Sequence, residues 1–141
     1  MKKRRLRIVL LLLALAVQGF AAGVERLSVP SASMNKEIPV LVVLPDIALA
    51  SEGKSCPVVY LLHGYGGNAE TWLTVKPDLP QIADQKGIIF VCPDAQNSWY
   101  WDSPVDSAFR YETFVASELV GYIDLHYKTI AERKGRAIAG L

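Results

Sequence analysis

Two kinds of apolar pattern predict the strands of this chain. Residues 24–29 and 37–44 flank a polar turn region at 31–36, which indicates a pair of antiparallel strands. Residues 58–62 and 88–91 are continuous apolar runs. Such runs are typical of strands that are covered on both faces in a parallel sheet. We therefore expect antiparallel entry strands followed by parallel ones.

Two further segments carry helical patterns. Residues 78–86 begin near an aspartate and end at Gly87, which favours a helix between the two apolar runs. From 111 to 127, apolar residues recur at three- and four-residue steps on one helical face: Val115, Leu119, Val120, Ile123 and Tyr127. A strand is predicted at 136–139, and the small, polar segment 47–55 is predicted to be a surface loop. This order predicts a single α/β domain, a sandwich with a mostly parallel sheet.

The N-terminus has the pattern of a secretory signal. Five basic residues lie within positions 2–7, and the ten residues 8–17 are all apolar. A stable membrane anchor needs about 20 apolar residues, so this stretch is too short to be one. Small residues at positions 19 and 21 indicate cleavage after Ala21. We therefore expect residues 1–21 to be a signal peptide and the protein to be secreted or periplasmic.

The net charge and the potential metal ligands of the chain argue against two classes of function. Five of the 15 basic residues and none of the 14 acidic ones precede residue 22, so the remainder carries a net charge of −4. This net negative charge predicts no basic surface for binding nucleic acid. The two histidines and two cysteines form no metal-ligand cluster, and we expect no metal. Cys56 and Cys92 are expected to be buried thiols, because they fall at opposite ends of neighbouring strands.

A glycine-rich loop follows the apolar run at 58–62 and is the main candidate for chemistry. It reads His63-Gly64-Tyr65-Gly66-Gly67-Asn68. Loops at the carboxyl edge of a parallel sheet are where ligands usually bind in such folds. Glycines leave the backbone amides free to approach a developing oxyanion, which is worth roughly 3–4 kcal/mol per donor. The backbone N–H of Tyr65 is the best donor candidate, with Gly64 and Gly66 shaping the loop.

Together with other stretches, this loop resembles a known family. The stretches are 61–68, Pro93-Asp94, 111–114, Arg133 and 136–141. They are similar to the Putative esterase family of α/β-hydrolases, which includes tributyrin esterase, S-formylglutathione hydrolase, feruloyl esterases and mycolyltransferases. The resemblance implies that residues 22–141 are the N-terminal portion of a single esterase domain, the N-terminal part of an α/β-hydrolase sandwich. It also implies hydrolysis of small-molecule or carbohydrate esters, such as acetyl or feruloyl esters, without a cofactor.

The resemblance also implies where the catalytic residues lie. In the family, the segment similar to 136–141 is followed by Ser-Met-Gly-Gly, whose serine is the nucleophile. The triad follows the chain order serine, acid, histidine, so all three members are expected after Leu141. We therefore predict that the 141-residue chain alone is inactive and poorly stable. His63 is expected to position its loop, and His126 to have a packing role.

The aromatic loop at 96–104 supplies candidate substrate contacts. Trp99, Tyr100 and Trp101 offer flat apolar faces to a sugar or phenolic ester, and Asn97 and Asp102 offer polar contacts. An equally weighted alternative is that Trp99 and Trp101 only anchor the loop. Trp72 is expected to belong to the core.

Two other functions remain open at this point. An acyltransferase could use the same fold, with a sugar in place of water as acyl acceptor. Alternatively, the 141 residues could form a non-catalytic module that binds carbohydrate or a partner protein. The sequence carries no signal for an oligomeric state.

Overall fold

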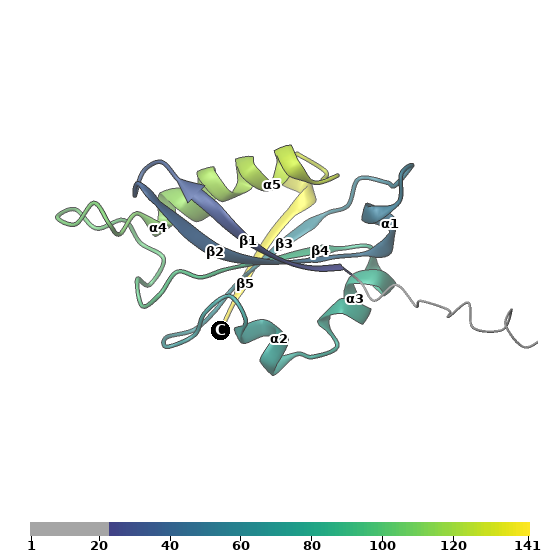
Figure 1. Ribbon diagram of the computed structural model, residues 1–141, viewed down its shortest axis with the longest axis horizontal. Coiled ribbons are helices and arrows are strands. Elements are labelled where there is room, and N and C mark those ends of the chain that lie inside the picture. Colours follow the sequence, from purple (N-terminus) through teal and green to yellow (C-terminus); the bar gives the residue numbers. More distant parts are fainter. Residues whose placement is uncertain (1–22) are drawn as a thin grey trace, which may run out of the picture.

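The central feature of the molecule is one mixed sheet of five strands in the order β1-β2-β4-β3-β5 (Figure 1). The computed structural model describes residues 23–141, and the predicted signal peptide at 1–21 lies outside these residues. The strands are β1 (Gly23–Ser31), β2 (Lys36–Leu44), β3 (Val58–Leu62), β4 (Ile89–Pro93) and β5 (Arg136–Gly140).

Strand directions divide the sheet into two parts. β1 pairs with β2, and β2 pairs with β4, in antiparallel register. β3 runs parallel to β4 on one side and to β5 on the other. The predicted antiparallel entry strands and parallel β3, β4 and β5 are therefore confirmed, within one or two residues at each boundary.

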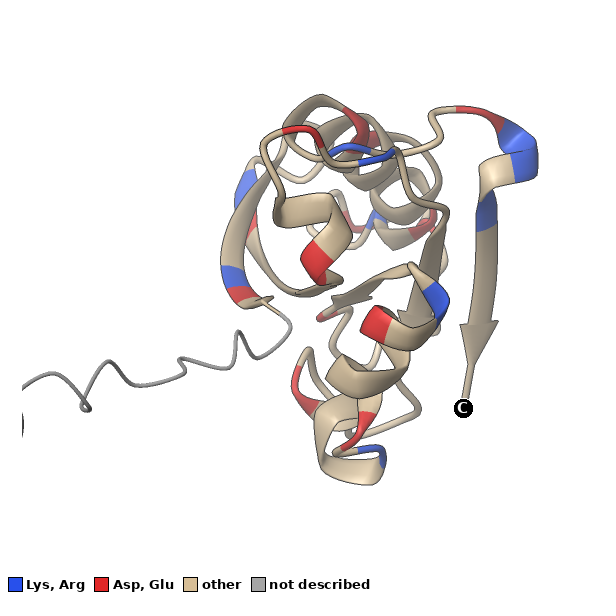
Figure 2. Ribbon diagram, turned by 90° about the vertical axis from the view of Figure 1, so that its right-hand side faces the viewer, with Lys and Arg blue, Asp and Glu red and all other residues tan. Residues whose placement is uncertain are grey.

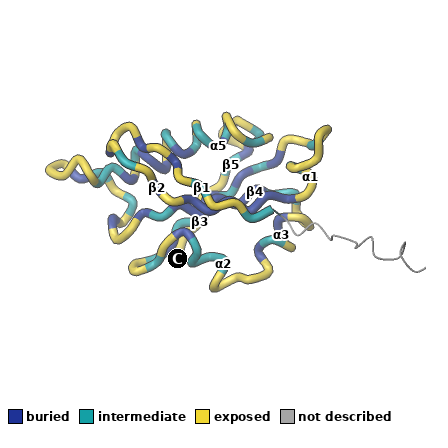
Figure 3. Tube along the Cα trace, viewed as in Figure 1, coloured by how far each residue is buried: buried dark blue, intermediate teal, exposed yellow. Residues whose placement is uncertain are grey.

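The sheet separates two hydrophobic cores, and alternate residues of one strand belong to different cores. Val40 and Val42 of β2 pack in one core, whereas Leu41 and Val43 pack in the other. Because both faces are buried, residues 38–44 of the strand are apolar without interruption. Figure 3 shows the buried strands between more exposed outer segments.

Helices cover both faces of the sheet (Figure 1). The short helix α2 (Thr71–Val75) and helix α3 (Leu79–Lys86) lie on one face, and Leu79 and Ala83 of α3 pack into its core. Helix α3 ends at Gly87, whose φ of 63° is the left-handed conformation that favours glycine at a helix end. The predicted helix at 78–86 is therefore confirmed.

The other face is covered by a continuous helical segment from 111 to 126. It consists of α4 (Tyr111–Thr113), a π-helical part (Phe114–Leu119) and α5 (Val120–His126). Phe114, Leu119 and Ile123 are fully buried against the sheet. The predicted amphipathic helix is confirmed, although its period did not reveal the π-helical part.

Two short helices are corrections to the predicted elements. The segment predicted as a loop at 47–55 begins within helix α1 (Asp46–Leu49), and α2 was not predicted at all. Both helices have at most five residues, and neither contains a buried residue. Such short segments give no amphipathic period that a sequence pattern can detect. A short 3₁₀ turn at Arg133–Gly135 leads into β5.

The two cysteines lie on opposite sides of the sheet. Cys56 belongs to the core under the long helical segment, and Cys92 belongs to the core under α3. Both are buried and free, as predicted. Burial raises the pKa of the Cys92 thiol to about 12, which keeps this thiol protonated and unreactive at neutral pH.

Within residues 23–141, no helix has the length and apolar character needed to cross a membrane. Charged residues are mixed on the side of the molecule seen in Figure 2, apart from a basic segment that leads into β5. This segment contains Arg133, Lys134 and Arg136. Arg136 pairs with Asp124 near the end of α5, so it connects the long helix to β5.

Asp102 caps the N-terminal end of the long helical segment. Its Oδ1 accepts a hydrogen bond from the Thr113 backbone N–H at 3.0 Å, and its Oδ2 accepts one from the Thr113 hydroxyl at 2.5 Å. The first backbone N–H groups of a helix have no partner within the helix. Asp102 therefore acts as a cap from outside the helix, and these bonds hold the pKa of its carboxyl below the usual range.

The packing of the long helix predicts a contrast between two leucines. Leu119 is fully buried, whereas Leu125 is 82% exposed. Leu119→Ala is expected to lower the free energy of unfolding by about 2–5 kcal/mol, because it leaves a cavity under the helix. The matched control Leu125→Ala should change it by less than about 0.5 kcal/mol. Urea unfolding measures both values, and equal effects would contradict this packing.

The capping role of Asp102 predicts a pH-dependent loss of stability. Because its folded pKa is lowered, its carboxylate stabilises the fold above the unfolded pKa of about 3.9, and this contribution disappears as the pH falls through the folded pKa. Asp102→Asn should therefore lower the urea midpoint at pH 7, and the difference should shrink below about pH 4. Glu52→Gln, an exposed carboxylate, is the control. A difference that stays constant with pH would contradict the cap.

Candidate oxyanion site

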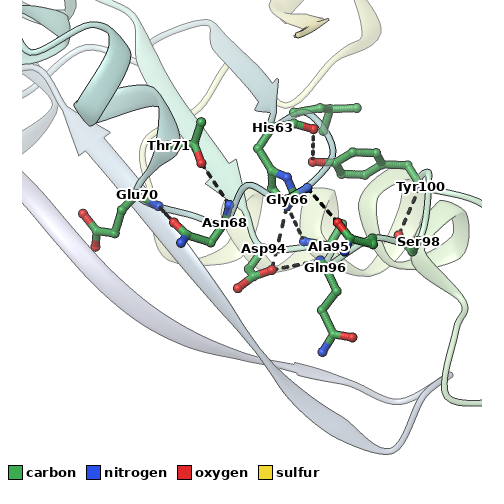
Figure 4. Close-up of polar contacts among 12 residues, drawn as sticks. His63, Gly66, Asn68, Glu70, Thr71, Asp94, Ala95, Gln96, Ser98 and Tyr100 are labelled. Atoms are coloured by element: carbon green, nitrogen blue, oxygen red, sulfur yellow. Dashed lines mark hydrogen bonds and ion pairs between the residues drawn. The ribbon is translucent and has the colours of Figure 1, made fainter.

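Three segments meet at the carboxyl ends of the parallel strands. The glycine-rich loop follows β3, the aromatic loop follows β4, and Leu141 follows β5. They enclose a small pocket of about 100 Å³. Its lining residues are His63, Gly64, Tyr65, Gln96, Asn97, Trp99, Tyr100 and Leu141. Figure 4 shows the polar contacts between the first two loops.

The glycine-rich loop contains a tight turn at residues 64–67. The Gly67 N–H donates to the Gly64 carbonyl at 3.0 Å, and Gly66 has a φ of 77°. This combination is the type II turn, which requires glycine at its third position. Leu141, which follows β5, lies close to Gly64: a Cβ added at Gly64 would be 3.6 Å from the Cβ of Leu141. The turn therefore sits beside the end of β5.

His63 connects this turn to the loop after β4. Its side chain is almost fully buried, and its Nε2 accepts a hydrogen bond from the Ala95 backbone N–H at 3.0 Å. Because Nε2 is an acceptor, the hydrogen-bond network assigns the ring proton to Nδ1. Nδ1 then donates to the Gly64 carbonyl at 2.7 Å. These contacts support the predicted positioning role of His63.

The two hydrogen bonds on the Gly64 carbonyl orient the next amide. In a trans peptide the C=O and N–H groups point in opposite directions, so fixing the Gly64 carbonyl also fixes the Tyr65 N–H. The Gly66 N–H donates to Asn97 Oδ1 at 2.7 Å, and the Gly67 N–H is held within the turn. The Tyr65 N–H has no acceptor among residues 23–141. It is thus a fixed and available donor, as its predicted oxyanion role requires.

The aromatic loop is shaped by residues with left-handed backbone angles. Gln96, Trp99 and Tyr100 have φ values of 50°, 55° and 55°. Such angles are costly for bulky residues and persist only where surrounding contacts enforce them. The Tyr100 hydroxyl donates to the His63 carbonyl at 3.1 Å, and burial raises the pKa of this hydroxyl above its usual range. This loop and the glycine-rich loop therefore form one hydrogen-bonded unit.

An exposed aromatic pair lies above the pocket. Tyr65 and Trp99 are 72% and 75% exposed, and their ring centroids are 5.7 Å apart at an interplanar angle of 30°. Exposed aromatic rings next to a pocket are typical of binding surfaces. The pair offers an apolar face at the pocket mouth.

The structure brings together only some of the predicted substrate contacts. Asn97, Trp99 and Tyr100 line the same pocket as Gly64 and Tyr65. Trp101 and Asp102 do not line it, and the Asp102 carboxylate is occupied by Thr113. The Asn97 oxygen is likewise occupied, by Gly66.

The structure also places three other residues, Ala95, Trp72 and His126. No sequence pattern indicated Ala95, because only its backbone N–H takes part, as the donor to His63 Nε2. Trp72 is only partly buried, and its Nε1–H donates to the Leu62 carbonyl at 3.1 Å. His126 stacks on Tyr122 at 3.9 Å, outside the pocket lining and in agreement with a packing role.

A larger, mostly apolar cavity of about 480 Å³ lies between the long helical segment and strands β3 and β5. The Tyr60 hydroxyl and Arg136 Nε are buried there without a hydrogen-bond partner in the described chain. Within residues 23–141, no group of three or more potential ligands could hold a metal ion.

Comparison with known proteins identifies the family. The model of the family described as "Putative esterase" matches residues 31–141. Esterase Rv1288 of Mycobacterium tuberculosis (strain H37Rv) is 38% identical over 105 residues, which cover 72% of this chain and 23% of the relative. The chain thus spans about a quarter of that relative.

Solved structures show the same fold. A ferulic acid esterase is 31% identical with a TM-score of 0.71, and the match covers 86% of this chain and 48% of that one. An S-formylglutathione hydrolase from Agrobacterium tumefaciens is 21% identical with a TM-score of 0.73, covering 86% and 49% of the two chains. The predicted α/β-hydrolase architecture is therefore confirmed, and the chain belongs to the Putative esterase family of α/β-hydrolases.

Proposed function

We propose that the whole protein to which this chain belongs hydrolyses carboxylic esters through an acyl-enzyme. The observation that carries this proposal is the fixed, unoccupied Tyr65 N–H beside the end of β5. Acyl transfer needs such a donor close to its nucleophile. We place the nucleophilic serine directly after Leu141 and the other two triad members later in the chain.

The chemistry follows from these positions. The serine oxygen attacks the ester carbonyl while a histidine accepts the serine proton. The carbonyl oxygen becomes an oxyanion, which accepts hydrogen bonds from the Tyr65 N–H and from the amide after the serine. Collapse of this intermediate releases the alcohol, which takes the proton from the histidine. Water then releases the acid by the same two steps.

The aromatic pair supports a finer proposal about the substrate. Tyr65 and Trp99 would present flat apolar faces to a phenolic acyl group such as a feruloyl ester. The 31% identical ferulic acid esterase agrees with this substrate class. The signal pattern at 1–21 supports action outside the cytoplasm, where phenolic and acetyl esters of polysaccharides would be accessible.

The catalytic proposal predicts a difference between the given chain and a longer product. DNA sequencing downstream of the Leu141 codon is expected to show Ser-x-Gly in frame, followed by an aspartate or glutamate and a histidine. The whole reading frame should hydrolyse p-nitrophenyl acetate, and a fluorophosphonate should abolish this activity. The 141-residue chain alone should be inactive. Inhibitor-sensitive turnover by the short chain, or none by the whole product, would contradict the proposal.

The substrate proposal predicts a selective effect of Trp99. In the whole product, Trp99→Ala should raise KM for methyl ferulate about three- to tenfold, because an aromatic pair contributes about 0.5–1.5 kcal/mol beyond its buried area. Turnover of p-nitrophenyl acetate should change little. Trp101→Ala is the matched control, since Trp101 is exposed but does not line the pocket. Equal effects of the two substitutions would contradict a contact with Trp99.

A further inference from the structure

The two loops that line the oxyanion pocket beside Tyr65 also line a second pocket with other residues. It has a volume of about 250 Å³ and lies between residues 68–70, Asp94 and strands β1 and β2. β2 runs antiparallel to β4, and the Asp94 N–H donates to the Pro39 carbonyl at 2.9 Å. The second pocket, called the Asn68 pocket, therefore lies at the same edge of the sheet as the oxyanion pocket. The two pockets share no lining residue.

The Asn68 pocket combines apolar side chains with a few polar groups, as small-molecule sites generally do. Ala69 and four residues of β1 and β2 form its apolar part: Leu27, Pro39, Val40 and Leu41. The polar part consists of Arg26, Asn68, Glu70 and Asp94. The ligand that these polar groups can bind depends on which of their atoms are already paired within the protein.

Asn68 and Asp94 each use one side-chain atom within the protein and keep another available. Asn68 Oδ1 accepts the Glu70 N–H at 2.8 Å, and this contact assigns Nδ2 to the other position of the amide. Asp94 Oδ1 accepts the Gln96 N–H at 2.9 Å. Asn68 Nδ2 and Asp94 Oδ2 have no hydrogen-bond partner among residues 23–141. Both side chains line the pocket, and they lie next to each other in Figure 4.

Arg26 and Glu70 largely neutralise each other. The Arg26 Nε and Nη2 groups donate to the two Glu70 carboxylate oxygens at 2.5 Å and 3.0 Å, a bidentate arrangement. Arg26 Nη1 has no such partner in the part of the chain that the structure describes, so it remains a donor. The Asn68 pocket thus offers donors from Asn68 and Arg26 and one charged acceptor from Asp94.

We propose that the Asn68 pocket binds one unit of a neutral carbohydrate. A hydroxyl group both donates and accepts hydrogen bonds, so sugar hydroxyls can pair with Asp94 Oδ2 and with the donors of Asn68 and Arg26 at the same time. The C–H face of the same ring can pack on the apolar residues of the pocket. An ammonium group would leave these donors without an acceptor, and an anion would be repelled by Asp94. A neutral ring with several hydroxyls satisfies both kinds of polar group.

This site extends the proposed substrate from its acyl group to its carbohydrate part, and that role rests on the proposed function. β4 and β5 flank β3, and β2 lies beyond β4. The pocket therefore lies two to three strand spacings, or roughly 10–15 Å, from the end of β5. A few sugar units span this distance, so the pocket fits a sugar that is remote from the esterified one. Sugar binding itself requires no catalysis.

Binding of sugars without an ester tests the pocket directly. The whole product is titrated with xylotriose, cellotriose and mannotriose, and saturation-transfer difference NMR follows the binding. At least one triose should bind saturably. Asn68→Ser and Asp94→Ser each keep an oxygen that can accept the same backbone N–H but remove the free group that faces the pocket. Each should weaken triose binding about three- to tenfold, in line with the loss of one hydrogen bond.

Asp106→Ser is the matched control for these variants. Asp106 Oδ1 accepts the Ala108 N–H at 2.9 Å, which is the same type of contact two residues along the chain, and Asp106 does not line the pocket. This variant should bind the triose like the parent. The proposal would be overturned if no triose bound saturably. It would also be overturned if Asn68→Ser and Asp94→Ser both bound like the parent, or if Asp106→Ser weakened binding as much as they do.

Hydrolysis kinetics test whether the pocket serves the substrate. In the whole product, Asn68→Ser and Asp94→Ser should each raise the ratio of KM for a feruloylated xylo-oligosaccharide to KM for methyl ferulate about three- to tenfold, because methyl ferulate has no sugar to lose contact. Weaker triose binding with an unchanged ratio would overturn the substrate role alone. Absence of hydrolysis in the unaltered product would instead contradict the proposed function and leave the binding result standing.

Discussion

The hydrogen bonds of the His63 ring are the constraint on which the site depends. One ring nitrogen accepts from Ala95 after β4, and the other donates to Gly64 after β3. Parallel β3 and β4 fix the distance between these loops, and the ring spans it. Because the ring is buried, water does not compete effectively for either bond. The direction of the Tyr65 N–H follows from this bridge.

The sheet order explains why the remaining parts of the site converge. β3 lies between β4 and β5, so the loops after its two neighbours flank the glycine-rich loop on either side. Asn97 in the loop after β4 accepts a hydrogen bond from the glycine-rich loop, and Leu141 at the end of β5 lies beside Gly64. The same order places the apolar strand faces between two layers of helices. Fold and site therefore depend on the same strand arrangement.

The features predicted from sequence are those encoded by local patterns. Continuous apolar runs identified the strands, and Gly87 identified the end of α3, because backbone geometry restricts these positions. Contacts between distant segments had no such signal. The bond between Asn97 and Gly66 joins residues 31 positions apart. Asp102 caps its helix through Thr113, 11 residues later, which no local capping motif describes, so the sequence pattern favoured a substrate contact for its carboxylate.

The aromatic loop combines a costly backbone conformation with a set of stabilising hydrogen bonds. Its three residues with left-handed angles cost roughly 1–3 kcal/mol each, or about 3–9 kcal/mol together. Seven hydrogen bonds involve residues 95–100, and at about 0.5–1.5 kcal/mol each they contribute a similar amount. Three of these seven bonds join the loop to His63 and Gly66 of the glycine-rich loop, so part of its stabilisation comes from that loop. The glycine-rich loop is likewise held by the aromatic loop, because the Gly66 N–H donates to Asn97 and the His63 ring accepts from Ala95. Each loop therefore specifies the conformation of the other, and the orientation of Tyr65 is a property of the pair.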